Sequence, residues 1–131
     1  MSLRAVAIFP EIKSENLEEF KKVAGEMLNH IDNADFIVRY DLFFDAQEKI
    51  CVVLEEYPNA AGVIEHVKRH SEFLEKLTAL GGQIQGQMFP IDVEDERLQS
   101  IRDSWSSVIH QYFAGKKNPG SLEHPGPSST R

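Results

Sequence analysis

The sequence contains a single cysteine, Cys51, among its 131 residues. One cysteine excludes a disulfide within the chain and any zinc site built from several cysteines. No apolar run approaches the roughly 20 residues of a membrane-spanning helix, and residues 1–10 lack the charged and then apolar segments of a secretion signal. We therefore expect a soluble, cytoplasmic protein without a membrane partner.

Basic side chains are also scarce. The 14 Lys and Arg residues stand against 21 Asp and Glu residues, a net charge of −7, and the longest basic run is Lys116-Lys117. Nucleic acids and anionic membranes bind clustered basic side chains, so neither is an expected partner. The length and a hydrophobic content of 41% suit one globular domain. We place this domain at residues 1–113 and predict a flexible tail, rich in Gly, Pro and Ser, at 114–131.

Hydrophobic periodicity predicts a core of six elements within residues 4–91. Alternating apolar residues predict strands at 4–9, 36–44, 50–57 and 83–91. Apolar residues three and four apart predict helices at 14–31 and about 60–80. This order is that of the ferredoxin-like α+β fold, a split βαββαβ arrangement with an antiparallel four-stranded sheet and both helices on one face. The C-terminal extension at 92–113 is predicted to contain a short helix at 92–104. Residues 107–113 are predicted to form either a fifth strand or an arm that packs on a partner.

The sheet face that the helices leave open is expected to be apolar too. Ile37 and Phe43 alternate with Phe36, Tyr40 and Phe44, so both faces of this strand carry hydrophobic side chains. An exposed apolar sheet face is an interaction surface, and a second copy of the same sheet is the simplest cover. We therefore expect a homodimer.

Three segments resemble the antibiotic biosynthesis monooxygenase superfamily. They are VRYDLFFD at 38–45, VVLEEY at 52–57 and the helix that follows, with the matching positions Tyr40, Leu42, Asp45, Glu55, Tyr57 and His66. The resemblance covers roughly residues 4–90. It implies a dimeric α+β barrel of two face-to-face sheets, with a small-molecule pocket in each subunit between the sheet and the helices. Relatives include cofactor-free oxygenases of aromatic polyketides and haem-degrading enzymes.

Haem degradation is not the expected activity. That branch of the superfamily uses an Asn on the first strand, with a Trp and a His on or near the second helix. Here the first strand, at 4–9, has no Asn, and the only tryptophan, Trp105, lies outside the matching segments. The resemblance therefore favours an oxygenase that needs no cofactor.

Two histidines on the second predicted helix are the first candidates for chemistry. At about 100° per residue, His70 lies in the middle of the apolar stripe of Val63, Val67 and Leu74, and His66 lies about 40° to one side. Both rings should therefore point toward the sheet or a cavity. Three interpretations stay open: packed histidines bonded to a carbonyl or a carboxylate, a general base in a pocket, or two ligands of a metal, for which spacing places no third ligand.

Four further residues are candidates for binding a substrate. Glu55 and Tyr57 share a largely apolar strand face, where a buried carboxylate needs a partner or a raised pKa. Arg39 on the neighbouring strand is the expected ion-pair partner of Glu55 if the strand register places both side chains on the same face, and orientation of a substrate is the alternative role. Tyr40 suits core packing or ring orientation. Trp105 could cover a pocket or anchor the extension.

These observations predict a cofactor-independent monooxygenase of the antibiotic biosynthesis type, acting on an aromatic, polyketide-like small molecule. The predicted base is His66 or His70, and Tyr40, Glu55, Tyr57 and Trp105 are predicted to bind the substrate. The alternative is a non-catalytic dimer that binds a small ligand. An enzyme needs a titratable group in an otherwise dry pocket, whereas a filled barrel would enclose both histidines with their hydrogen bonds satisfied.

Overall fold

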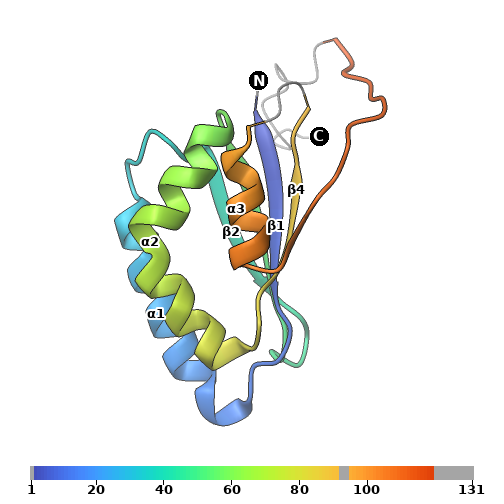
Figure 1. The fold of residues 1–131 in the computed structure, drawn as a ribbon. Coiled ribbons are helices and arrows are strands. Elements are labelled where there is room, and N and C mark those ends of the chain that lie inside the picture. The colour runs from blue at the N-terminus through green and yellow to red at the C-terminus, as the bar shows by residue number, and fades with distance from the viewer. Residues whose placement is uncertain (1, 92–94, 120–131) are drawn as a thin grey trace.

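A computed structural model of the chain describes residues 2–91 and 95–119 and has two layers, a sheet and a layer of helices (Figure 1). The sheet has the strand order β2-β3-β1-β4-β5. All its pairs are antiparallel except β4 with β5, which is parallel. The strands are β1 (Leu3–Phe9), β2 (Arg39–Phe44), β3 (Cys51–Tyr57), β4 (Gln85–Phe89) and β5 (Ser107–Ile109).

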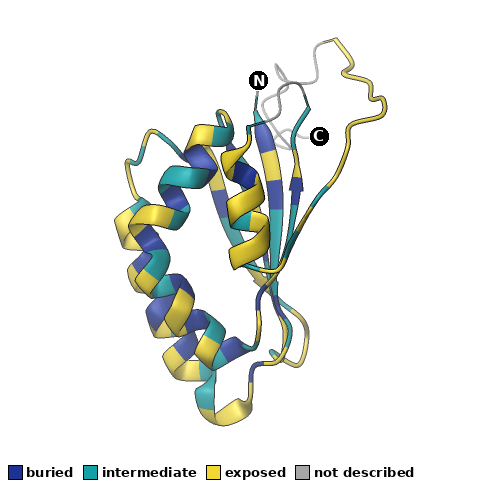
Figure 2. Cartoon of the chain, in the orientation of Figure 1, coloured by how far each residue is buried: buried dark blue, intermediate teal, exposed yellow. Residues whose placement is uncertain are grey.

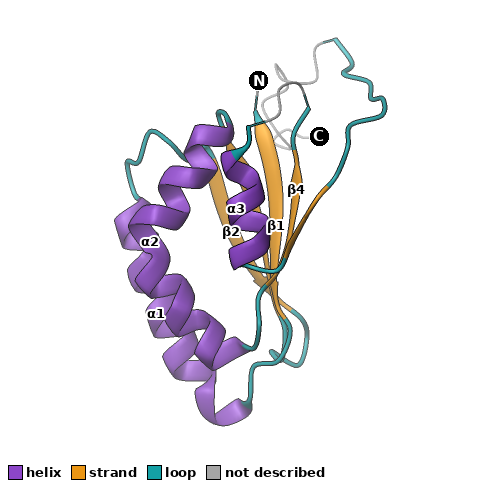
Figure 3. Ribbon diagram, viewed as in Figure 1, coloured by secondary structure: helices purple, strands orange, loops and turns teal. Residues whose placement is uncertain are grey.

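The helices lie together on one side of this sheet, as Figure 3 shows by colour. A short 3₁₀ turn, Ser14–Asn16, leads into α1 (Leu17–Ile31), and α2 (Ala60–Gly81) packs beside it. The third helix, α3 (Arg97–Ser104), packs against α2 and β5. The ferredoxin-like order and the placement of both long helices on one face are confirmed, and α3 and β5 extend the arrangement at the β4 edge.

Alternation along the strands divides the two faces of the sheet. On β3, Cys51, Val53 and Tyr57 are buried against the helices, whereas Leu54 is exposed on the opposite face (Figure 2). The other exposed large apolar residues of the sheet region are Val38, Phe43, Phe89 and Val108. The face opposite the helices therefore exposes large apolar side chains to solvent in the single chain, as the pattern predicted, and these stand beside charged side chains such as Arg39 and Glu56.

The first part of the strand predicted at 36–44 is wrong. Regular pairing begins at Arg39, and Ile37, predicted to share the open face with Phe43, is buried with only 9% of its surface exposed. The chain in this region passes close to α2. An added Cβ on Gly62 would lie 2.4 Å from the carbonyl oxygen of Phe36. This approach shifts the alternation by one residue ahead of β2.

The other boundaries differ at their ends. The fourth strand is shorter than 83–91. Of the helix predicted at 92–104, residues 92–94 lie outside the described part, residues 95 and 96 are not helical, and the helix begins at Arg97. The fifth strand exists but ends at Ile109, and residues 110–119 are exposed without helix or strand. The predicted tail at 114–131 lies outside the described residues from 120 onward. The α2 helix, predicted to end at about residue 80, ends at Gly81 and is followed by Gly82, which has a φ of 93°.

Candidate functional site

A small cavity of about 60 Å³ lies between the sheet and the helices. Its walls come from β1–β4, α2 and the segment that ends α3 and begins β5. Five of the six predicted site residues line it: Tyr40, Glu55, Tyr57, His66 and Trp105. The sixth, His70, does not. The structure thus brings most of the candidates to one place, and their chemical roles stay predictions.

Strand register explains how the cavity forms. Tyr40 is paired with Glu55, Glu55 with Ala5, and Ala5 with Met88, so this row of side chains points toward the helices. Small side chains on β1 and β4, among them Ala5, Ala7 and Gly86, line the cavity beside the larger ones. The small side chains at positions 5 and 7 are the sequence signal for this space, although their alternation with larger residues predicts only a buried strand.

The carboxyl group of Glu55 is the most perturbed acid of the site. The hydroxyl of Tyr57 donates a hydrogen bond of 2.5 Å to Glu55 Oε1. Burial raises the pKa of Glu55 to about 7, and the hydrogen bond from Tyr57 acts in the opposite direction. Near neutral pH this carboxyl group therefore exists in both protonation states, as a group that accepts and returns a proton should.

The predicted ion pair between Arg39 and Glu55 is wrong. Arg39 is paired in the sheet with Glu56, not with Glu55, so its side chain lies on the solvent face. There its guanidinium donates to Asp41, with 2.5 Å between Nε and Oδ2. The partner of Glu55 is instead Tyr57, a neutral donor two residues along the same strand.

His66 is buried in the wall of the cavity, with 3% of its surface exposed. Its ring centroid lies 5.0 Å from that of Tyr40 and 6.0 Å from that of Tyr57. Burial, with a smaller contribution from His70, lowers the pKa of His66 to about 3. The ring is therefore neutral at physiological pH, and it is a weak base that can still donate or accept hydrogen bonds.

His70 is equally buried, but it lines a different space. Its Nδ1 lies 2.9 Å from Nδ1 of His66, so the two rings share a hydrogen bond. Burial lowers the pKa of His70, and the backbone carbonyl of His66 opposes this effect. The two rings are packed together and bond to each other, whereas the packed interpretation expected a carbonyl or a carboxylate as the partner; the roles of both histidines stay predictions. Within residues 2–91 and 95–119, no three His, Cys, Asp or Glu side chains are grouped to hold a metal ion.

Trp105 follows α3 and is partly buried against the core. With Ile101 and Ser107 it forms the part of the cavity wall that the C-terminal extension supplies. Trp105 thus both lines the cavity and packs against the core, and its predicted roles as a pocket cover or as an anchor of the extension stay predictions.

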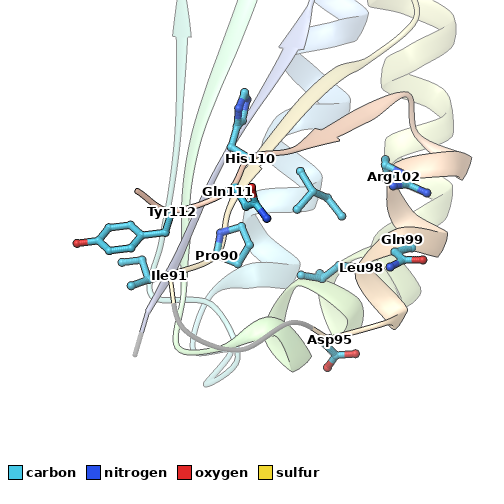
Figure 4. Close-up of a pocket in the computed structure, with 10 residues that line it drawn as sticks. Pro90, Ile91, Asp95, Leu98, Gln99, Arg102, His110, Gln111 and Tyr112 are labelled. Atoms are coloured by element: carbon cyan, nitrogen blue, oxygen red, sulfur yellow. The ribbon is translucent and has the colours of Figure 1, made fainter. Parts of the chain in front are cut away.

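Beyond the small cavity, one larger hollow of about 580 Å³ is lined by His70. Two others lie beside α3 and on the open sheet face, and Glu55 also lines the latter. One, of about 470 Å³, opens between α3 and the ends of β4 and β5 (Figure 4). Its charged side chains are already paired, Asp95 with Arg97 at 2.7 Å and Arg102 with Asp103 at 3.0 Å. The other, of about 500 Å³, lies on the open sheet face beneath residues 110–113 and is lined largely by apolar side chains. The sequence contained no motif at either place.

Comparison with known proteins shows what the fold is similar to. No protein-family model matches the chain, and no curated protein does. Among solved structures, MupZ from Pseudomonas fluorescens has a TM-score of 0.76 at 16% identity and covers 91% of this chain and 96% of its own. SnoaB, a cofactor-independent oxygenase from Streptomyces nogalater, has a TM-score of 0.59 at 14% identity, with 71% and 95% covered. An antibiotic biosynthesis monooxygenase has a TM-score of 0.59 at 21% identity, with 71% and 99% covered.

The chain therefore has the fold of the antibiotic biosynthesis monooxygenase superfamily. The likeness to MupZ is longer and must include part of the extension with α3 and β5. At these identities the comparisons establish the fold, and the chemistry has to be argued from the site. In the part of the chain that the structure describes, no helix is long and apolar enough to cross a membrane.

Proposed function

We propose that this protein is a cofactor-independent monooxygenase that acts on a small aromatic, polyketide-like compound. One observation carries the proposal: Glu55, with a pKa of about 7, is held by Tyr57 in the wall of a mainly apolar cavity. An acid tuned to neutral pH in such a surrounding is the typical arrangement of a catalytic base. The fold shared with SnoaB, a cofactor-independent oxygenase, supports the reaction class.

In this mechanism Glu55 removes a proton from a carbon next to the aromatic ring. The carbanion reacts with dioxygen, and the returning proton completes a hydroperoxide. Removal of the second hydrogen of that carbon as a proton expels the distal oxygen, which leaves as water. A CH₂ group and O₂ thus become a carbonyl group and H₂O. Glu55 takes the place predicted for His66 or His70, because an imidazole with a pKa of about 3 is a weak base.

The size of the cavity requires part of its wall to move when an aromatic substrate binds. A benzene ring needs a cavity of about 150 Å³, whereas the space beside Glu55 measures about 60 Å³. Trp105 and Ile101 form the wall contributed by the extension and belong to none of the long elements of the core. We propose that the substrate ring replaces the indole there, while Tyr40 and Tyr57 contact its opposite side.

The test is oxygen uptake on a panel of anthrone-type compounds, with the oxygen source traced by ¹⁸O₂ and mass spectrometry. We expect one labelled oxygen per product, also after treatment with a chelator. Turnover should fall by at least about 100-fold in Glu55→Gln. The matched control is Glu56→Gln, the next residue on β3, which should keep wild-type turnover. Full turnover in Glu55→Gln would disprove the assignment of the base.

We also propose that the protein is a homodimer through the open sheet face. Phe43 and Leu54 are 52% and 45% exposed on this face, and large apolar patches of this kind mark interfaces. Leu54→Glu should therefore yield monomers in sedimentation equilibrium. Leu28→Glu, on the exposed side of α1, should leave the dimer intact. A wild-type monomer would contradict the proposal.

The second candidate is a non-catalytic dimer that binds a small ligand. The small cavity and the mutual hydrogen bond of His66 and His70 favour it, because both are features of a filled core. Native mass spectrometry of the untagged protein separates the two functions. A retained small mass with no oxygen uptake on any aromatic compound would favour ligand binding.

A further inference from the structure

The paired histidines connect two separate spaces of the molecule. His66 lines the cavity that contains Glu55. His70 lines a surface hollow of about 580 Å³, together with His30, Asp35 and Arg69. The only link needed between the two spaces is the 2.9 Å hydrogen bond from Nδ1 to Nδ1.

The local backbone is shaped for this contact. His70 has φ −114° and ψ 17°, which departs from α-helical values and interrupts α2 at this residue. Phe36 and Phe73 pack around His70, with ring centroids 6.2 Å and 6.3 Å from that of His70. A phenylalanine at position 70 would fill the space of the imidazole, so packing alone does not call for a histidine there. Two buried polar rings are unfavourable unless they are bonded, so the hydrogen bond between them accounts for the burial of both.

We propose that His66 and His70 form a proton relay between the cavity and solvent. His66 accepts a proton from the cavity side at Nε2 while its Nδ1 proton passes to Nδ1 of His70. His70 in turn releases its Nε2 proton toward the surface hollow. One proton enters the pair and one leaves, and each ring stays neutral. The catalytic use of this path rests on Glu55 acting as the proposed base, and the path itself does not.

The surroundings favour two neutral rings. The titratable groups that line the cavity with His66 are Tyr40, Tyr57 and Glu55, and the charged or titratable groups that line the hollow with His70 are His30, Asp32, Asp35 and Arg69. Burial, with a smaller contribution from His70, lowers the pKa of His66. Burial also lowers the pKa of His70, with His30 and Arg69 acting in the same direction. A concerted transfer, in which no imidazolium accumulates, is the step that such an environment permits. The cavity is also large enough for a water molecule to join Glu55 to His66.

The first test is ¹⁵N NMR of histidine-labelled protein without any substrate. Two neutral rings joined through their Nδ1 atoms must be opposite tautomers, one with its proton on Nδ1 and the other on Nε2. We expect this pair of tautomers at neutral pH and a scalar coupling between the two Nδ1 nuclei across the hydrogen bond. Identical tautomers, or no coupling, would overturn the relay.

The second test is the rate at which the ring N–H of His66 exchanges with water. His70→Phe should slow this exchange on the order of tenfold or more, with far-UV circular dichroism unchanged. His70→Gln is the discriminating variant, because an amide can bond His66 but cannot pass the proton on. We expect slow exchange in both variants. Restored exchange in His70→Gln would indicate a purely structural contact and overturn the relay.

The control is His30→Phe. The ring of His30 lies 6.4 Å from that of His70, and its replacement should leave the exchange of the His66 ring N–H at the wild-type rate. Unchanged exchange in His70→Phe would mean that His66 reaches water through the cavity, which also overturns the proposal. Because these measurements need no substrate, a failed relay leaves the oxygenase assignment standing. A protein without oxygenase activity would likewise leave the relay to be judged by exchange alone.

Discussion

Glu55 and His66 should affect the pH dependence of stability with opposite signs. Glu55 has a pKa of about 7 in the folded protein against 4.5 in its ordinary state, so between these values the folded chain keeps a proton that the unfolded chain loses. The contribution of Glu55 to the free energy of unfolding is therefore largest below pH 4.5 and falls as the pH rises toward 7. The slope is at most about 1.4 kcal/mol per pH unit.

For His66 the direction is reversed. Its pKa is about 3 in the folded protein against 6.5 ordinarily, so between these values the unfolded chain binds the extra proton. Its contribution is complete above pH 6.5 and falls as the pH drops toward 3, again by at most about 1.4 kcal/mol per unit. The two windows overlap between 4.5 and 6.5, where the contributions should largely cancel in the wild-type protein.

Substitution should remove this cancellation. Urea unfolding measured at about pH 5 and about pH 6 should show this. Relative to wild type, the free energy of unfolding of Glu55→Gln should rise by about 1 kcal/mol per unit of increasing pH, and that of His66→Phe should fall by a similar amount. Glu56→Gln, on the opposite face of the same strand, is the control for removing a carboxylate and should parallel the wild-type curve. The reasoning is refuted if Glu55→Gln and Glu56→Gln have the same slope.

Three further outcomes are expected. Gly62→Ala should destabilise the protein by about 2 kcal/mol in urea unfolding, because the added Cβ would lie 2.4 Å from a backbone carbonyl oxygen. Its control, Gly25→Ala, should stabilise the protein by up to about 1 kcal/mol, because a Cβ added there would have no neighbouring atom within 4 Å. Tyr57→Phe removes the donor that lowers the pKa of Glu55, so ¹³C NMR should show a pKa above 7. Burial raises the pKa of the Cys51 thiol to about 12, so a thiol reagent should label it only after unfolding; fast labelling of the native protein would contradict this burial.

The fold followed from the sequence because its elements are strongly periodic. The two-residue alternation of β3 placed Cys51, Val53, Glu55 and Tyr57 on one face, and the structure confirms this placement. Helical spacing turned His66 inward on α2, where it is buried. Both are local properties, since a side chain's face depends only on its own strand or helix.

The contacts within the site depend on information that is not local. Arg39 was paired with Glu55 because the two residues lie on neighbouring strands, but a register shift of one residue moves a side chain to the other face. The hydrogen bond between His66 and His70 depends on the interrupted backbone at His70, which apolar periodicity does not reveal. The perturbed pKa of Glu55 depends on burial, which only the assembled layers determine.

The opposite pKa shifts of Glu55 and His66 also restrict which substrates the proposed enzyme can deprotonate. Both groups favour their neutral forms for the same physical reason, since burial disfavours a protonated imidazole as much as a carboxylate. Proton transfer to Glu55 therefore places the only new negative charge of the cavity on the substrate. Each unit by which the pKa of the bound substrate exceeds about 7 makes this transfer less favourable by about 1.4 kcal/mol. The site should thus select compounds whose anion is delocalised over several rings, and simple phenols or ketones should not turn over.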